Sequence, residues 1–132
     1  MKHRALHLLC IFVAAAGWMA CGAGHPTITR ITVSPSQASA GVRGGDVQFT
    51  ANATFSNNTS RELTVADGLT WSVAPNATAS ISDNGSATCL VVGQAVVTAT
   101  APTELNLTIN NGINNTSPKV SGTATLSCIP TP

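Results

Sequence analysis

The chain contains 132 residues with a formal net charge of +1, and 8% of its residues are charged. This length allows one ordinary domain, and the charged fraction lies far below the roughly one quarter that is typical of soluble domains. The few basic residues are scattered, which excludes the basic stripe that nucleic-acid binding requires. A disordered chain would carry more net charge and fewer β-branched residues, so we expect a folded domain.

The first 20 residues have the pattern of an export signal. Lys2 and Arg4 form a basic start, and an uncharged apolar run follows from Ala5 to Gly17. A helix of about 13 residues reaches only about 20 Å, which is short of the roughly 30 Å hydrocarbon core of a membrane. We therefore predict a signal peptide over residues 1–20 that is removed on export. A short anchor that stays attached is the alternative.

Small residues flank Cys21 at the end of this segment, with Ala20 before it and Gly22 after it. This placement resembles the lipobox of bacterial lipoproteins, although Trp18 stands where that family has Leu or another aliphatic residue. The resemblance implies that Cys21 becomes an acylated first residue, with residues 21–27 as anchor and tether, and that acyl chains hold the protein on a membrane. The alternative is ordinary cleavage after Gly22, which leaves a soluble exported protein.

From Ile28 onward, short stretches alternate apolar and polar residues between turn residues, and none has the 3.6-residue period of a helix. Pro35 ends the first stretch, and a polar loop and a short apolar patch around Leu63 and Val65 separate the second stretch from the third. The predicted strands, in chain order, cover Ile28–Ser34, Asp46–Phe55, Leu69–Val73, Ala79–Ser82, Ala87–Val92, Gln94–Ala101 and Lys119–Cys128.

About seven short strands at roughly ten-residue spacing predict an all-β fold, an antiparallel β-sandwich. The pair Asn84-Gly85 favours the positive φ angles of a tight hairpin turn. Phe49, Phe55 and Trp71 all fall on the faces that we expect to form the core. We therefore interpret them as core residues and not as the exposed rings of a sugar-binding surface.

Five stretches carry a family likeness. They are Ile31-x-Val33-x-Pro35, Val47-Gln48-Phe49-Thr50-Ala51, Leu69-Thr70-Trp71-Ser72, Ala79-x-Ile81-x-x-x-Gly85 and Gly93-x-Ala95-x-Val97-Thr98-Ala99. Their combined order resembles the bacterial Ig-like domains of group 2 (BIG2-like). The resemblance covers most of Ile28 to Cys128 and implies an immunoglobulin-like sandwich of surface proteins and adhesins, which we place at residues 28–129. Cys89, where the family often has a small residue such as Gly, and a long Asn-rich loop depart from the family pattern.

Cys89 and Cys128 are the cysteines that this domain can use, because Cys10 and Cys21 belong to the export segment. An exported protein meets an oxidising environment, so we predict a Cys89–Cys128 disulfide; two buried free thiols are the alternative. In an Ig-type strand order the two cysteine-bearing strands run in the same direction, which brings both cysteines toward one end. The bond requires a Cα separation of about 5 to 6 Å.

No catalytic or metal-binding set is apparent in the domain. Histidine occurs only before it, at positions 3, 7 and 25, so the usual base of a nucleophilic triad is missing. Asp46, Asp67 and Asp83 stand at turns, which is their ordinary structural placement, and neither an EF-hand nor a zinc spacing occurs. We predict no catalytic residue, no metal, no cofactor and no enzymatic activity.

The long loop from Pro102 to Pro118 is the candidate contact surface, because long loops often carry function; a mobile linker is the alternative. The sequence therefore predicts a non-enzymatic, membrane-anchored cell-envelope module for binding or adhesion to an unidentified surface protein or glycan. A purely structural envelope or spacer domain without a ligand is the alternative. The candidate binding residues of the loop are Asn106, Asn110, Asn111, Asn114 and Asn115.

Overall fold

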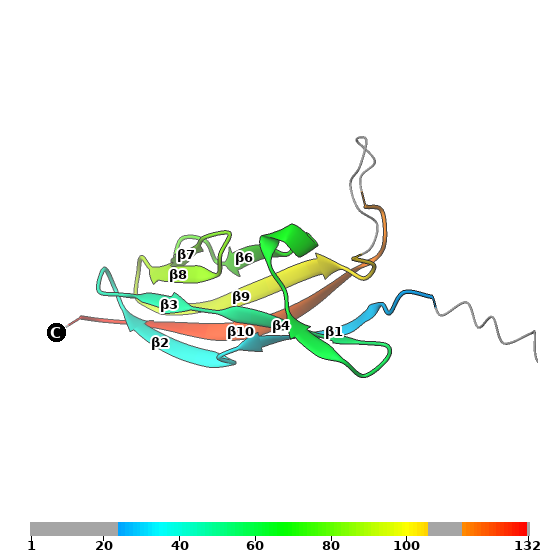
Figure 1. Ribbon diagram of the computed structural model, residues 1–132. Helices are drawn as coiled ribbons and strands as arrows, with labels where there is room; N and C mark the ends of the chain where they lie inside the picture. Colours follow the sequence, from blue (N-terminus) through cyan, green and yellow to red (C-terminus); the bar gives the residue numbers. More distant parts are fainter. Residues whose placement is uncertain (1–23, 106–114, 132) are drawn as a thin grey trace, which may run out of the picture.

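The computed structural model describes residues 24–105 and 115–131, which form a β-sandwich with one short 3-10 helix (Figure 1). The predicted all-β class is confirmed. The predicted signal peptide and Cys21 lie outside the described residues. The elements are β1 (Ile28–Ser34), β2 (Gln37–Gly41), β3 (Asp46–Gln48), β4 (Thr50–Phe55), β5 (Ser60–Glu62), the 3-10 helix η1 (Val65–Asp67), β6 (Thr70–Ala74), β7 (Ala79–Ile81), β8 (Ser86–Cys89), β9 (Gly93–Pro102) and β10 (Lys119–Ile129).

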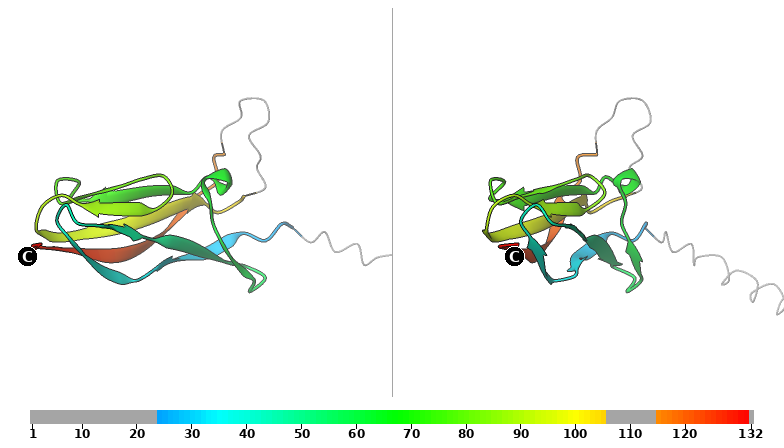
Figure 2. Two further views of the ribbon diagram at one scale, coloured as in Figure 1. Left: turned by 60° about the vertical axis from the view of Figure 1, so that its left-hand side comes forward. Right: turned by 90° about the vertical axis from the view of Figure 1, so that its left-hand side faces the viewer.

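The described strands pair into three sheets, one with the order β2-β10-β9-β6 and two with the orders β1-β4-β5 and β3-β8-β7. The longest pairing joins β9 and β10, which run side by side along the molecule in register from Lys119 opposite Pro102 to Cys128 opposite Gly93 (Figure 1). All pairs are antiparallel except that of β2 with β10, which is parallel. β1 starts at one end of the sandwich, and β10 finishes at the opposite end (Figure 2).

The predicted strand Asp46–Phe55 is divided at Phe49. Before this residue, β3 pairs with β8, and after it β4 pairs with β1. The Phe49 amide donates instead to the carbonyl of Gly85 at 2.9 Å, and the Phe49 side chain is 1% exposed. The prediction of one continuous strand is therefore wrong, because the chain moves from one sheet to the other while its side chains keep their alternation.

The core follows the period-2 alternation of the strands. In β4, Ala51, Ala53 and Phe55 are buried while Asn52 is exposed. Alanine is the commonest of the buried apolar residues, and the largest fully buried side chains are Phe49, Leu126, Val97 and Cys89. Small side chains contribute little apolar area each, so this core provides less hydrophobic stabilisation than one built from leucine and isoleucine.

Two short strands were not expected from the sequence. β2 consists of Ala, Ser, Gln and Gly residues, which have no strong strand propensity, and it forms because β10 offers a free edge beside it. β5 is polar and exposed, and it forms by pairing with β4. The predicted strand Ala87–Val92 ends at Cys89, and Leu90, Val91 and Val92 are exposed.

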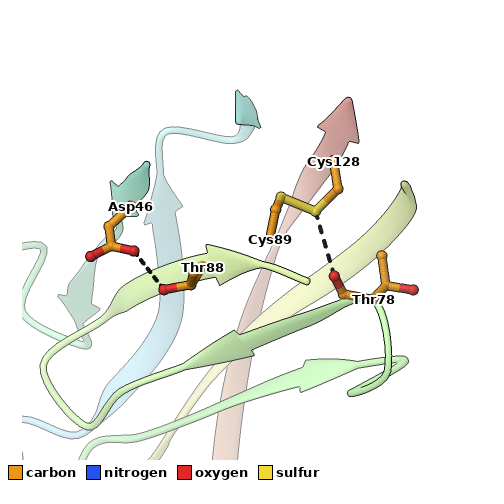
Figure 3. The surroundings of a disulfide bond; sticks show 5 residues. All are labelled: Asp46, Thr78, Thr88, Cys89 and Cys128. Atoms are coloured by element: carbon orange, nitrogen blue, oxygen red, sulfur yellow. Dashed lines mark hydrogen bonds between the residues drawn. A yellow bond between two sulfur atoms is a disulfide. The ribbon is translucent and has the colours of Figure 1, made fainter. Parts of the chain in front are cut away.

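The predicted disulfide joins Cys89 of β8 to Cys128 of β10 with a Cα separation of 5.4 Å (Figure 3). Both cysteines are almost fully buried, at 0% and 2% exposure. The carbonyl oxygen of Thr78 lies 3.7 Å from Sγ of Cys128. The bond therefore links a strand of the β3-β8-β7 sheet to a strand of the four-stranded sheet near the C-terminal end of the sandwich.

Removing this bond is expected to lower the free energy of unfolding by about 4 kcal/mol, because the chain-entropy model assigns about that value to a cross-link between residues 39 apart. The variant is the double substitution Cys89→Ala and Cys128→Ala, and the measurement is urea unfolding without reductant. Reductant should destabilise the wild type and leave the variant unchanged. A variant as stable as the wild type would contradict this expectation.

Candidate functional site

The described part of the predicted binding loop is its base. The Thr103 amide donates to the Pro118 carbonyl at 2.8 Å, and Nδ2 of Asn115 donates to the Glu104 carbonyl at 2.7 Å. Oδ1 of Asn115 accepts hydrogen bonds from the amide and the hydroxyl of Ser117, at 3.0 and 2.7 Å. Asn115 therefore holds the two sides of the loop base together. The other four predicted contact residues, Asn106, Asn110, Asn111 and Asn114, lie outside the described residues.

The loop base lies next to the start of the domain. The amide of Ile28, the first residue of β1, donates to the Thr103 carbonyl at 2.8 Å. Leu105 packs against the core and lines a hollow of about 450 Å³ together with His25, Pro26 and Arg61. The tether and the loop therefore belong to the same end of the sandwich.

A second hollow, of about 290 Å³, was not expected from the sequence. Its floor is formed by buried apolar residues and by Trp71 of β6, and its rim carries polar side chains. The contributing residues come from segments far apart in the chain, so no spacing pattern in the sequence could have identified it. The lining comprises Phe49, Thr50, Ala51, Glu62, Leu63, Thr64, Val65, Ala66, Leu69, Trp71, Asp83 and Asn84.

Trp71 packs against the core, as predicted, but it is only partly buried. The described side chains include no buried nitrogen or oxygen atom without a hydrogen-bond partner. No hydrogen bond among the described residues has the Trp71 indole N–H as its donor, so this group keeps contact with solvent. Trp71 lines the hollow, so a ligand there can contact this residue.

An ion pair holds the 3-10 helix at the rim. Nη1 and Nη2 of Arg61 donate to the two carboxylate oxygens of Asp67, at 2.9 and 2.7 Å, and the Thr64 amide donates to Oδ2 of Asp67 at 2.9 Å. The Arg61 guanidinium also lies 5.7 Å from the centre of the Phe55 ring. The hydrogen bonds from Arg61, followed by that from the Thr64 backbone, lower the pKa of Asp67. The hydrogen bonds to Asp67 raise the pKa of Arg61.

This ion pair gives a pH dependence of stability. The pKa of Asp67 is lower in the folded than in the unfolded state. The ion pair therefore contributes fully to the free energy of unfolding above the pKa of the unfolded state, and this contribution is lost as the pH falls through the pKa of the folded state. The substitution Asp67→Asn is expected to cost about 0.5 to 1 kcal/mol of unfolding free energy near pH 7, measured by urea unfolding. The difference from the wild type should shrink toward about pH 2.

The matched control for this measurement is Asp83→Asn, which removes an aspartate that forms no ion pair among the described residues. This control should show no comparable loss of stability at neutral pH. An Asp67→Asn difference that stays constant from neutral to acid pH would contradict the assignment to the Arg61 pair.

The three turn aspartates make different contacts. Asp46 accepts a hydrogen bond from Oγ1 of Thr88 at 2.5 Å (Figure 3), Asp67 binds Arg61, and Asp83 lies at the rim of the hollow. In the part of the chain that the structure describes, no group of three or more His, Cys, Asp or Glu residues is placed to hold a metal ion. No helix within the described ranges has the length and apolar character needed to cross a membrane.

The outer face of the four-stranded sheet is rich in hydroxyl groups. Thr98 of β9 lies opposite Thr123 of β10 and Ser72 of β6, and Thr100 lies opposite Ser121 and Thr70. The hydroxyls of Thr100 and Ser121 are hydrogen-bonded at 2.7 Å. Apart from Lys119 at the start of β10, the four strands contain no charged residue. The face is therefore almost uncharged and rich in hydroxyl groups, with the exposed side chain of Val96 beside them.

No protein-family model matches the chain. The sequence is similar to ice-binding protein 1 of Shewanella frigidimarina (strain NCIMB 400), to which it is 33% identical over 87 residues. The similarity covers 62% of this chain but only 9% of that protein, so the chain spans a small part of the length of this relative.

Proposed function

We propose that the chain is a non-enzymatic, Ig-like cell-surface module of the bacterial group 2 type that binds or adheres to a partner at the surface. Cys21 is its lipid-attachment site and anchors it to the membrane of the cell envelope. The strand arrangement is the observation that carries the Ig-like part of this proposal. The export signal and the lipobox-like residues carry the part that concerns location.

The strand order supports an Ig-like assignment. In immunoglobulin-type sandwiches, strands A, B, E and D form one sheet and C, F and G the other. Here β9 lies between β6 and β10, as F lies between C and G, and β8 lies between β3 and β7, as E lies between B and D. β1 pairs with β4, which continues β3, as A pairs with B. Trp71 lies on β6, the counterpart of the C strand that carries the core tryptophan of many such domains.

The disulfide departs from the immunoglobulin pattern. It joins β8 to β10, the counterparts of strands E and G, whereas the disulfide of antibody domains joins B to F. Both bonds nevertheless connect two sheets through the core. The departure therefore concerns which strands are linked and is compatible with the proposed fold family.

The non-enzymatic part rests on the sequence. A nucleophilic triad needs a base beside the nucleophile, and the histidines of the chain stand at positions 3, 7 and 25, before the domain. A purely structural spacer without a ligand is the alternative.

Display of the full chain on an exporting bacterium tests the proposal. We expect the protein to be found in the membrane fraction with the mass of an acylated chain starting at Cys21, and the displaying cells to adhere saturably to a cell or matrix surface. The variant Cys21→Ser should release the protein from the membrane and abolish adhesion of the cells. Membrane attachment without adhesion would favour the spacer, and a wild type that is not acylated would contradict the anchor.

A second candidate function follows from the hydroxyl-rich face together with the similarity to part of an ice-binding protein. Strands lie about 4.8 Å apart, and side chains on one face of a strand repeat at about 6.7 Å, so the hydroxyls of β6, β9 and β10 form a lattice. A lattice of uncharged donors and acceptors on a rigid sheet can match ordered water.

Inhibition of ice recrystallisation by the purified full chain tests this second function. Thr98→Lys or Thr123→Lys, which places a charge at the centre of the face, should abolish the inhibition. Thr32→Lys is the matched control, because Thr32 is an exposed residue of β1 in another sheet. Growth of ice crystals that is the same with and without the wild-type protein would exclude ice binding.

A further inference from the structure

We propose that the hollow beside Trp71 binds an organic cation with an apolar stem, namely a primary alkylammonium group such as that of a lysine side chain or a polyamine. This inference goes beyond the proposed surface role and does not depend on the lipid anchor or on the Ig-like assignment. It rests on the apolar floor, on the charge of the rim and on the fixed position of the elements that carry both.

The floor suits an alkyl stem. Phe49, Leu63 and Leu69 are 1%, 3% and 5% exposed, and together with Trp71 they give the hollow an apolar bottom. A hydrocarbon chain that enters displaces water from this surface, which is favourable. The ring of Trp71 adds attraction for a cation that lies over its face within about 6 Å.

The rim suits a positive charge. Glu62 and Asp83 are the charged residues of the lining, and both are exposed. No lysine, arginine or histidine contributes to the lining. Arg61, the neighbour of Glu62 in the chain, is held by Asp67 with two hydrogen bonds. Glu62 and Asp83 form no ion pair among the described residues, although Arg61 also donates to the Glu62 carbonyl at 3.1 Å. The lining therefore carries two negative charges and no positive one, which disfavours an anionic ligand.

The rim on the Asp83 side is held in position. The amide of Gly85 closes the turn by donating to the Ser82 carbonyl at 3.0 Å, and Nε2 of Gln48 donates to the Asn84 carbonyl at 2.7 Å. Gly85 has a φ of +84°, and a side chain there would overlap the Phe49 carbonyl and lie 3.1 Å from the Trp71 ring. The turn that carries Asp83 is therefore packed directly on the tryptophan.

The rim on the Glu62 side is held by the 3-10 helix. Glu62 is the last residue of β5 and pairs with Asn52 of β4. The 3-10 helix comes next in the chain, and the bonds of Asp67 to Thr64 and Arg61 fix its position. Both carboxylates consequently stand on elements that are already ordered before a ligand arrives. A site that is formed in advance loses less conformational entropy on binding.

The fluorescence of Trp71 provides the readout. The sequence contains two tryptophans and no tyrosine, so in the full chain with Trp18→Phe the tryptophan emission comes from Trp71 alone. Titration with n-pentylamine hydrochloride at low ionic strength should change this emission saturably, with weak affinity of about the millimolar range. 1-Pentanol, which has the same stem without the charge, should bind more weakly.

Variants of the two rim carboxylates separate the contribution of their charge to binding from that of apolar contact with the alkyl stem. Glu62→Gln and Asp83→Asn are each expected to weaken pentylamine binding about twofold to fivefold, as for exposed ion pairs, and the double variant more strongly. Glu104→Gln is the matched control, because Glu104 is exposed but absent from the lining, and it should bind as the parent does. Unchanged thermal midpoints show that the variants are folded.

The source of the cation is distinguished by comparing two larger probes. One probe is Nα-acetyl-lysine N-methylamide, which keeps the side-chain ammonium, and its tighter binding than that of pentylamine supports a lysine side chain of a protein partner. Tighter binding of spermidine than of pentylamine supports a free polyamine. Equal binding of pentanol and pentylamine, affinity that is unchanged in the double variant, or saturable binding of pentanoate or N-acetylglucosamine in place of pentylamine would overturn the proposal.

Discussion

The close approach of the layers, made possible by small side chains, is the constraint on which the rest of the structure depends. A methyl group at Gly122 of β10 would overlap the carbonyl oxygen of Ile31 in β1, and alanine is the commonest buried residue of the core. A thin core of this kind buries little apolar area, which is a general weakness of small domains. The Cys89–Cys128 bond adds a covalent link between the layers to the stabilisation that this packing provides.

The change of sheet at Phe49 connects the core to the hollow beside Trp71. Because β3 and β4 pair with different partners, the Phe49 amide is free to bond with Gly85, and this bond brings the β7–β8 turn onto the ring of Trp71. A continuous strand would have kept this amide in a regular ladder. One backbone irregularity therefore places an aromatic ring, a buried apolar floor and a carboxylate next to one another.

The two ends of the sandwich have different surroundings. The start of β1 is bonded to the base of the Asn-rich loop through Ile28 and Thr103, whereas the disulfide and the exposed residues Leu90 to Val92 follow the end of β8. An anchor at Cys21 would therefore hold the loop on the membrane side and direct the disulfide end outward.

The sequence by itself determined the all-β class, the cores of most strands, the Asn84-Gly85 turn and the cysteine pair, because these depend on side-chain alternation, local backbone preference and a choice between few cysteines. Gly85 takes the positive φ that the pair predicts, but Asn84 does not. Tertiary structure alone decided β2, β5, the break at Phe49 and the hollow beside Trp71. The physical reason is that edge strands form on partners supplied by distant segments, and a hollow is lined by residues whose proximity no local pattern records.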